Sequence, residues 1–137
     1  MATQFHLALP CVSINKTRIF YKDILGAKIG RSAIKWADIN FFEHQITFTE
    51  CGPFKFECQS YNFHGDILPS FHFGVILQTE QWNRMLIVLE SKSIAIHSQL
   101  KFLENKIGEH YSFFVKDPNG YTVEFKCFTH STDVFNA

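Results

Sequence analysis

Apolar and polar side chains alternate along residues 4–10 and again along residues 71–78. A period of two predicts a strand that buries one face and exposes the other. Both segments contain a phenylalanine followed by a histidine, His6 or His72, which falls on the face away from the large apolar residues. The shared pattern predicts that the two segments are the equivalent first strands of a duplicated module.

A helical pattern follows each of these strands. Asn15 is the predicted N-cap of a helix over about residues 16–25, and Gly26 provides a left-handed stop. In the second half Thr79 starts a helix whose large apolar residues recur at helical spacing. These residues are Trp82, Met85, Leu86 and Leu89.

Further strands are predicted after each helix. Residues 27–49 hold two or three strands, and the second half holds strands near residues 93–98, 110–116 and 121–127. Asp-Pro-Asn-Gly at residues 117–120 is a strong turn signal between the last two. Each half is therefore a predicted βαβββ module, which gives an α+β fold with the helices on the outer, phenylalanine-rich faces.

The two modules are joined by a segment of different composition. Residues 51–69 carry scattered glycine and proline without clean periodicity, so we expect a long connection or a lid over a site. Module 1 then covers about residues 4–50 and module 2 about residues 70–128, within a single domain over residues 1–128. Residues 129–137 are expected to form a loose C-terminal tail.

The bulk composition limits the partners. Thirteen basic and thirteen acidic residues cancel and no charged tract occurs, which argues against nucleic acid and anionic membranes and favours a small-molecule partner. No apolar run approaches the ~18 residues that span a bilayer, and no signal peptide is recognisable. The four cysteines form no C-x-x-C pair, which is typical of reduced thiols, so we expect a cytoplasmic protein.

The candidate chemistry is provided by His6, His72 and Glu124. Glu124 also lies opposite the large apolar residues of its strand, with Thr122 and Lys126 as neighbours on its face. Two histidines and one carboxylate are the ligand set of an open metal site. Taken singly, each residue has an ordinary interpretation: a strand histidine is usually a surface or hydrogen-bonded group, and Glu124 is the polar half of an alternating strand.

Four segments together resemble a known family, namely residues 5–10 (FHLALP), 20–26 (FYKDILG), 72–74 (HFG) and 117–125 (DPNGYTVEF). They are similar to the vicinal oxygen chelate superfamily, which includes glyoxalases, bleomycin-resistance proteins, fosfomycin-resistance thiol transferases and type I extradiol dioxygenases. The resemblance implies two tandem βαβββ modules that form a U-shaped mixed sheet around a central cavity, and a homodimer. The opening and central segments look most like predicted extradiol dioxygenase-like members.

Carried onto this sequence, the resemblance implies His6, His72 and Glu124 as ligands of a divalent metal, with Fe(II) favoured and Mn, Zn or Ni possible. The fourth ligand position of glyoxalase I falls on Thr47, which is a poor metal ligand. Three protein ligands match the extradiol dioxygenases and the fosfomycin enzymes better. Such a site leaves three adjacent positions on Fe(II), two for the oxygens of a catechol-type substrate and one for O₂.

The leading hypothesis is therefore extradiol dioxygenase-like ring cleavage of a catechol-type substrate. Phe114 stands where the extradiol enzymes carry a tyrosine, so the catalytic proton-transfer residues stay unknown; His110, Tyr111 or His64 are candidates to replace it. The alternatives are a metal-dependent lyase, isomerase or thiol transferase of the same superfamily, a metal-free bleomycin-resistance-like binding protein, and a regulatory domain that has lost its site.

Six residues are candidate substrate contacts. Arg31 is expected to hold an anionic group and Trp36 to stack on a ring, although an exposed arginine and a core tryptophan are the alternative. Lys126 lies on the same face as Glu124 and is a candidate substrate contact. The alternative is that it is simply solvated, as a lysine at the end of a strand usually is. The full set is Arg31, Trp36, Gln45, Thr47, Phe114 and Lys126.

Overall fold

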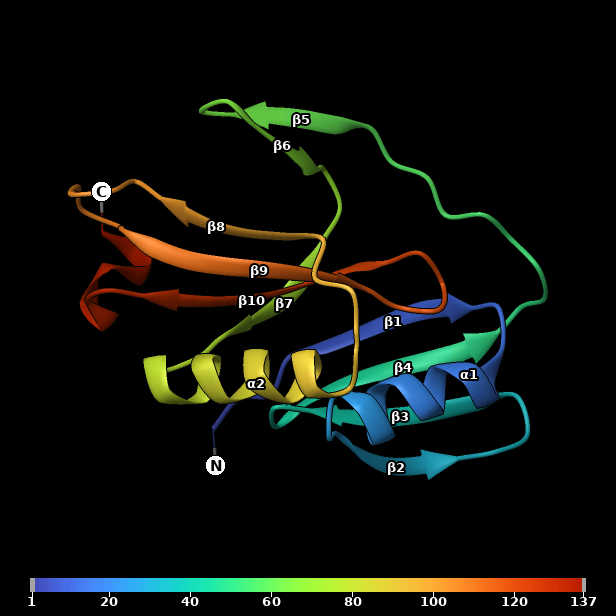
Figure 1. Cartoon of the computed structure of the whole chain (residues 1–137). Coiled ribbons are helices and arrows are strands. Elements are labelled where there is room, and N and C mark those ends of the chain that lie inside the picture. Colours follow the sequence, from blue (N-terminus) through green and yellow to red (C-terminus); the bar gives the residue numbers. More distant parts are fainter. Residues whose placement is uncertain (1, 137) are drawn as a thin grey trace. The chain divides into compact units, whose positions relative to one another are not determined.

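The computed structural model describes residues 2–136, and the chain divides into two compact units. The first unit holds the residues up to Phe56 together with Asp117–Gly120, and the second holds Glu57–Lys116 and the residues from Tyr121 onward. Each unit contains one four-stranded mixed sheet with a helix against it (Figure 1).

The sheet of the first unit has the strand order β1-β4-β3-β2, with β1 parallel to β4 and the other neighbours antiparallel. A continuous helix, α1 (Ile14–Arg18) followed by the π-helical η1 (Ile19–Ile24), covers its apolar face. The ring of Tyr21 lies 4.9 Å from that of Phe48, in the centre of this core. The strands are β1 (His6–Cys11), β2 (Lys28–Ser32), β3 (Trp36–Phe41) and β4 (His44–Glu50).

Helix α1 begins earlier than predicted. Ser13, not Asn15, is the N-cap: its backbone is extended and its Oγ accepts a hydrogen bond from the backbone N–H of Lys16 at 3.3 Å. Both residue types are good caps. The chain leaves β1 at Cys11, so Ser13 is already placed to cap and Asn15 falls inside the first turn.

The predicted turn at residues 117–120 is confirmed, and buried polar groups anchor it within the first unit. Oδ1 of Asn119 accepts the backbone N–H of Val12 at 2.8 Å. The hydroxyl of Tyr21 donates to Oδ2 of Asp117 at 2.9 Å. Because buried polar groups are stable only when paired, this network fixes the turn against the end of β1 and the helix.

The second unit repeats the plan of the first. Its sheet has the order β7-β10-β9-β8, with β7 parallel to β10, so the predicted pair of βαβββ modules is confirmed. Helix α2 (Thr79–Ser91) covers the apolar face through Trp82, whose indole N–H donates to the carbonyl of Phe125 at 2.8 Å. The strands are β7 (Phe73–Ile76), β8 (Ser98–Phe102), β9 (His110–Lys116) and β10 (Thr122–Phe128).

The linker contains a hairpin that the sequence pattern does not predict. Strands β5 (Ser60–Phe63) and β6 (Asp66–Pro69) are joined by His64 and Gly65, both with positive φ. Two left-handed residues form the tight turn that suits a twisted hairpin, but His-Gly is a weaker signal than Asn-Gly. The hairpin packs on the face of the second sheet opposite α2, so it is a cover as well as a connection.

Two other segments differ from expectation. The strand predicted near residues 93–98 is wrong, because Ser93 has a positive φ after α2 and pairing with β9 begins only at Ser98, opposite Phe114. The segment expected to be a loose tail forms the 3₁₀ helix η2 (Ser131–Phe135).

Gly74 permits the close approach of β7 and β10. A Cβ atom at this position would overlap the backbone carbonyl oxygen of Glu124. The corresponding pair in the first unit is Ala8 opposite Thr47, where a side chain is accommodated. The space beside Gly74 is therefore filled by the backbone of Glu124.

Gly74→Ala should lower the free energy of unfolding by about 1–3 kcal/mol, because the backbone of β10 has to move away. The matched control is Gly30→Ala, where the nearest atom to a new Cβ lies 3.5 Å away and no strain is expected. Urea denaturation of both variants provides the measurement. Equal stability of the two variants would contradict the close approach of these strands.

Candidate functional site

His72 and Glu124 are brought together within the second unit. Nε2 of His72 lies 3.1 Å from Oε2 of Glu124. His72 directly precedes β7, and Glu124 lies in the adjacent strand β10, so the sheet order produces the pairing. Glu124 is only 8% exposed, and a carboxylate at such depth requires compensating partners.

Two further side chains compensate Glu124. The hydroxyl of Ser112, a fully buried residue on β9, donates to Oε1 at 2.7 Å, and Nζ of Lys126 lies 3.8 Å from the same oxygen. Burial raises the pKa of Glu124, but the hydrogen bond from His72, the charge of Lys126 and the Ser112 hydroxyl outweigh it, so the pKa is lowered. Glu124 is therefore ionised at neutral pH.

The ring of His72 is held in one orientation. Its Nδ1 lies 3.0 Å from the carbonyl oxygen of Pro69, which only accepts, so Nδ1 carries a hydrogen. The hydrogen bond to Glu124 raises the pKa of His72 more than burial lowers it. When the ring is neutral, Nε2 has the free lone pair and faces the carboxylate. A backbone carbonyl behind one ring nitrogen is typical of metal-binding histidines.

His6 lies in the first unit, at the exposed start of β1 and opposite Gln45 in register. The structure thus brings together His72 and Glu124, while the third predicted ligand belongs to the other unit. Within residues 2–136, no three histidine, cysteine or acidic side chains are grouped as a metal site. The three-ligand set therefore stays a prediction.

The first unit has a buried carboxylate, Asp38, that is not among the residues predicted from the sequence. Asp38, 4% exposed, accepts the Thr47 hydroxyl at 2.7 Å and Nε of Arg31 at 2.8 Å. Burial raises the pKa of Asp38, but the hydrogen bond from Thr47 and the charge of Arg31 outweigh it and lower the pKa. The alternation in β3 places Asp38 on the face away from Ala37 and Ile39, but its position opposite Thr47 depends on the pairing of β3 with β4.

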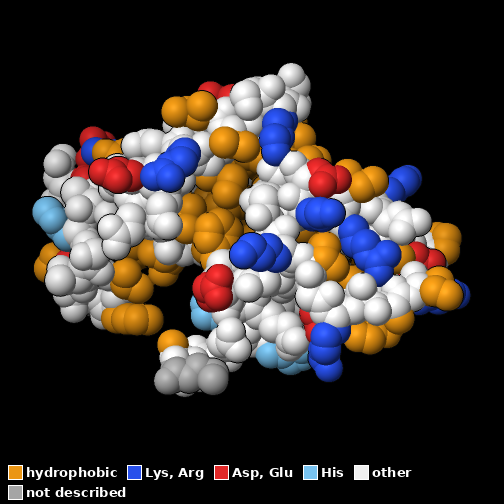
Figure 2. Space-filling model, turned by 90° about the horizontal axis from the view of Figure 1, so that it is seen from below, with side chains coloured by type: hydrophobic (Ala, Val, Ile, Leu, Met, Phe, Trp, Pro, Cys, Tyr) orange, Lys and Arg blue, Asp and Glu red, His pale blue; other side chains and the backbone are white. Residues whose placement is uncertain are grey.

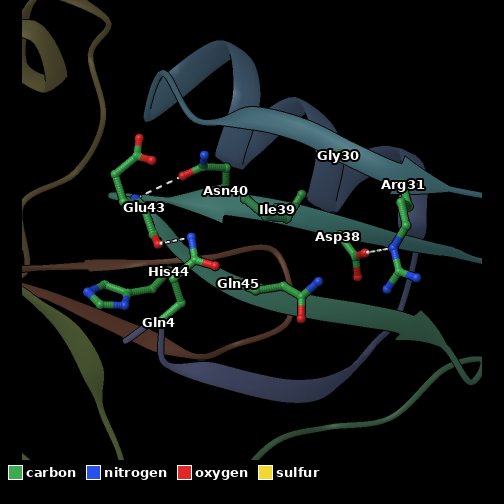
Figure 3. A pocket seen from close by; sticks show the side chains of 9 residues that line it. All are labelled: Gln4, Gly30, Arg31, Asp38, Ile39, Asn40, Glu43, His44 and Gln45. Carbon is green, nitrogen blue, oxygen red and sulfur yellow. Dashed lines mark hydrogen bonds and ion pairs between the residues drawn. The ribbon is translucent and has the colours of Figure 1, made fainter. Parts of the chain in front are cut away.

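The other candidate contacts divide between the units. In the first, the guanidinium carbon of Arg31 lies 5.8 Å from the ring centre of Trp36, and Arg31 and Gln45 line one cavity (Figure 3). In the second, Phe114 lies opposite Glu124 in register, and its ring centre is 5.8 Å from that of His72. Phe114 offers an apolar wall at this position and no hydroxyl.

A second cavity, of about 230 Å³, lies between the β5–β6 hairpin and the second sheet. Leu68 and Pro69 border it on the hairpin side, and Phe114 and Thr122 on the sheet side. Since Pro69 also holds His72, the cavity adjoins the His72–Glu124 pair.

Two of the candidate proton-transfer residues, His110 and Tyr111, lie on β9. Two positions before Ser112 on β9, His110 lies on the face of Glu124, whereas Tyr111 alternates to the opposite face and contacts Trp82. Burial lowers the pKa of His110, which favours the neutral ring that a proton acceptor needs.

Charged side chains of both signs are exposed on the surface of the structure (Figure 2). Basic side chains on the face shown in Figure 2 are interspersed with acidic, apolar and uncharged ones. No helix within the described residues combines the length and the apolar character that crossing a bilayer requires.

Comparison with known proteins gives a family and a fold. The family model described as the glyoxalase/bleomycin resistance protein/dioxygenase superfamily matches residues 3–125. A glyoxalase/bleomycin resistance protein/dioxygenase from Alicyclobacillus acidocaldarius has a similar structure, with a TM-score of 0.82, 23% identity, and coverage of 97% of this chain and 96% of that chain. No curated protein sequence matches the chain.

Two structures of named function are also similar. A fosfomycin resistance protein from Listeria monocytogenes has a TM-score of 0.66 at 14% identity, covering 97% of this chain and 98% of that one. A lactoylglutathione lyase from Agrobacterium tumefaciens has a TM-score of 0.66 at 12% identity, covering 100% and 98%. At these identities the likeness shows the fold alone.

The lowered pKa of Asp38 predicts a pH-dependent contribution to stability. The ionised Asp38 stabilises the folded protein at pH values above the ordinary pKa of 3.8. This stabilisation is lost as the pH falls through the lower pKa that Asp38 has in the folded protein. Asp38→Asn should therefore destabilise the protein by about 1–2 kcal/mol at neutral pH, and by less toward pH 2–3. Denaturation at a series of pH values measures this, with the exposed Asp23→Asn as control. A loss for Asp38→Asn that is constant with pH would contradict the assignment.

Proposed function

This chain belongs to the glyoxalase/bleomycin resistance protein/dioxygenase superfamily, and we propose that it is a metal-dependent enzyme acting on a small molecule with neighbouring oxygen atoms. The reaction that we place first is extradiol dioxygenase-like ring cleavage of a catechol-type substrate. The observation that carries the proposal is the His72–Glu124 pair, a histidine held through Nδ1 and a buried carboxylate held by Ser112.

The donor atoms of the second unit fit a divalent metal. Two ligands about 2.1 Å from a metal and at right angles are about 3 Å apart, and Nε2 of His72 is 3.1 Å from Oε2 of Glu124. His72 releases its Nε2 proton when that nitrogen becomes a ligand, while Pro69 keeps the ring in place. Ser112 holds the other carboxylate oxygen of Glu124.

His6 is the proposed third ligand, from the same chain or from the second subunit of the proposed homodimer. A 2-His-1-carboxylate set favours Fe(II), and Mn, Zn and Ni are the alternatives. Fe(II) bound there would supply Lewis-acid activation of a diol and open positions for substrate and O₂.

The remaining residues of the second unit would bind and shield the substrate. Phe114 provides a flat apolar wall beside His72, and the hairpin residue Leu68 packs with it and excludes water. Lys126 lies next to Glu124 and is placed to hold a negatively charged substrate oxygen. His110, with its lowered pKa, is the proposed proton acceptor in place of a tyrosine.

A second function is favoured by one observation. Phe114 has no hydroxyl group beside His72, so the dioxygenase reaction depends on His110 for proton transfer. A metal-dependent lyase, isomerase or thiol transferase would use the same ligands without that hydroxyl group. A metal-free binding protein has no need for a histidine oriented by Pro69 toward a buried carboxylate.

The first test is metal binding. The wild-type protein, incubated with Fe(II), Mn(II), Zn(II) or Ni(II) and desalted, should retain about one ion per site, and His72→Ala should lose it because Nε2 is removed. Ser112→Ala should weaken binding about 10–100-fold by releasing Glu124. His97→Ala, an exposed histidine of the same unit, is the control and should bind normally. Full metal content in a folded His72→Ala variant would remove His72 from the ligand set.

The second test is the reaction itself. With Fe(II) and a panel of catechols in air, the protein should consume oxygen and form yellow ring-opened products, because extradiol cleavage gives conjugated products. The His72→Ala variant should be inactive under the same conditions. If the wild-type protein binds metal but takes up no oxygen with any catechol, the lyase or transferase alternative replaces the dioxygenase.

A further inference from the structure

The first unit holds a polar site that the proposed metal chemistry does not need. Arg31 is at its centre: Nε donates to Oδ2 of Asp38 at 2.8 Å, yet the Arg31 side chain is 77% exposed. Within the part of the chain that the structure describes, neither Nη group of Arg31 donates a hydrogen bond. The outer edge of the guanidinium is therefore open to a ligand.

The orientation of Arg31 is fixed from behind. The Asp38 side chain is 6% exposed, and its other oxygen accepts the Thr47 hydroxyl at 2.7 Å, so both carboxylate oxygens are occupied. The ring of Trp36 supports the guanidinium at 5.8 Å. Ion pairs with an exposed partner add little to stability. A held guanidinium, however, loses less entropy when it binds a planar anion, which favours a recognition role.

A cavity of about 250 Å³ lies in front of this guanidinium (Figure 3). Asn40 and Gln45, which are opposite each other in register, contribute side-chain amides to its wall. Glu43 lies at the far end of the cavity from Arg31 (Figure 3). The charge and the hydrogen-bond donors thus favour placing an anionic group at the Arg31 end and a polar, uncharged body along the amides.

We propose that this cavity binds a small planar carboxylic acid, whose two carboxylate oxygens accept hydrogen bonds from the two Nη groups of Arg31. A planar carboxylate matches the geometry of the guanidinium edge, and Arg–carboxylate pairs of this kind are among the strong hydrogen bonds in proteins. Asp38 and Thr47 act as positioning residues. The site lies within the first unit, so the proposal stands or falls independently of the metal-dependent reaction.

Benzoate is the probe, added to chelator-treated, ¹⁵N-labelled protein. The NMR signals of the Trp36 indole N–H and the Arg31 Nε–H should shift and saturate. The Trp82 indole N–H, which is buried in the second unit and bonded to Phe125, should stay unchanged as an internal reference. Benzamide, with the same shape but no charge, should bind at least about tenfold more weakly.

Variants of the protein distinguish recognition of benzoate by the Arg31 guanidinium from a general effect of positive charge on the surface. Arg31→Gln should weaken benzoate binding at least about tenfold, and Arg31→Lys should also weaken it because the planar edge is lost. Asp38→Asn should weaken it by a smaller factor. Arg84→Gln, an exposed arginine of α2, is the matched control and should bind as the wild type does.

Three results would overturn the proposal: no saturable shift of the Trp36 and Arg31 signals, equal affinity of wild type and Arg31→Gln, or tighter binding of benzamide or inorganic phosphate than of benzoate. Because metal is absent from these samples, the failure of this proposal leaves the metal site untouched. Conversely, loss of metal binding in His72→Ala with benzoate binding retained would separate the two sites.

Discussion

The buried charge of Glu124 is the constraint around which the second unit is arranged. An ionised carboxylate is stable at this depth only when its oxygens are paired, and His72, Ser112 and Lys126 provide the partners from three positions along the sheet. The pairing requires β7 to approach β10 closely, which the missing Cβ of Gly74 permits. The histidine and the carboxylate are thus held in place by contacts within the second unit.

The two modules share a backbone plan and differ in where the charge lies. Ala8, Thr47 and Asp38 stand side by side in the first sheet, as Gly74, Glu124 and Phe114 do in the second. The buried carboxylate therefore lies on the last strand of the second module and on the neighbouring strand of the first. The two modules thus share a register but carry different chemistry at the inner positions.

The hydrophobic periodicity of the sequence predicted those features of the fold that depend on a single strand. The alternation around His6 and His72 gave the first strands, and the Asp-Pro-Asn-Gly signal gave the turn that Tyr21 and Asn119 anchor. The roles of Ser112 and Asp38 were missed because they depend on partners in neighbouring strands, which the pattern of a single strand does not specify. Whether His6, His72 and Glu124 meet at one metal is still harder to predict from the sequence, because it depends on how two separate units are combined.

The two buried carboxylates are compensated by cations of different chemistry, and this difference separates their uses. Arg31 pairs with Asp38 through Nε, and the open edge of its guanidinium is what a ligand meets. His72 is able to release the Nε2 proton, which leaves a lone pair beside a carboxylate whose remaining partners are Ser112 and Lys126. A divalent cation can restore that charge balance and bind both atoms. The identity of the compensating cation therefore favours metal at Glu124 and an organic anion beside Asp38.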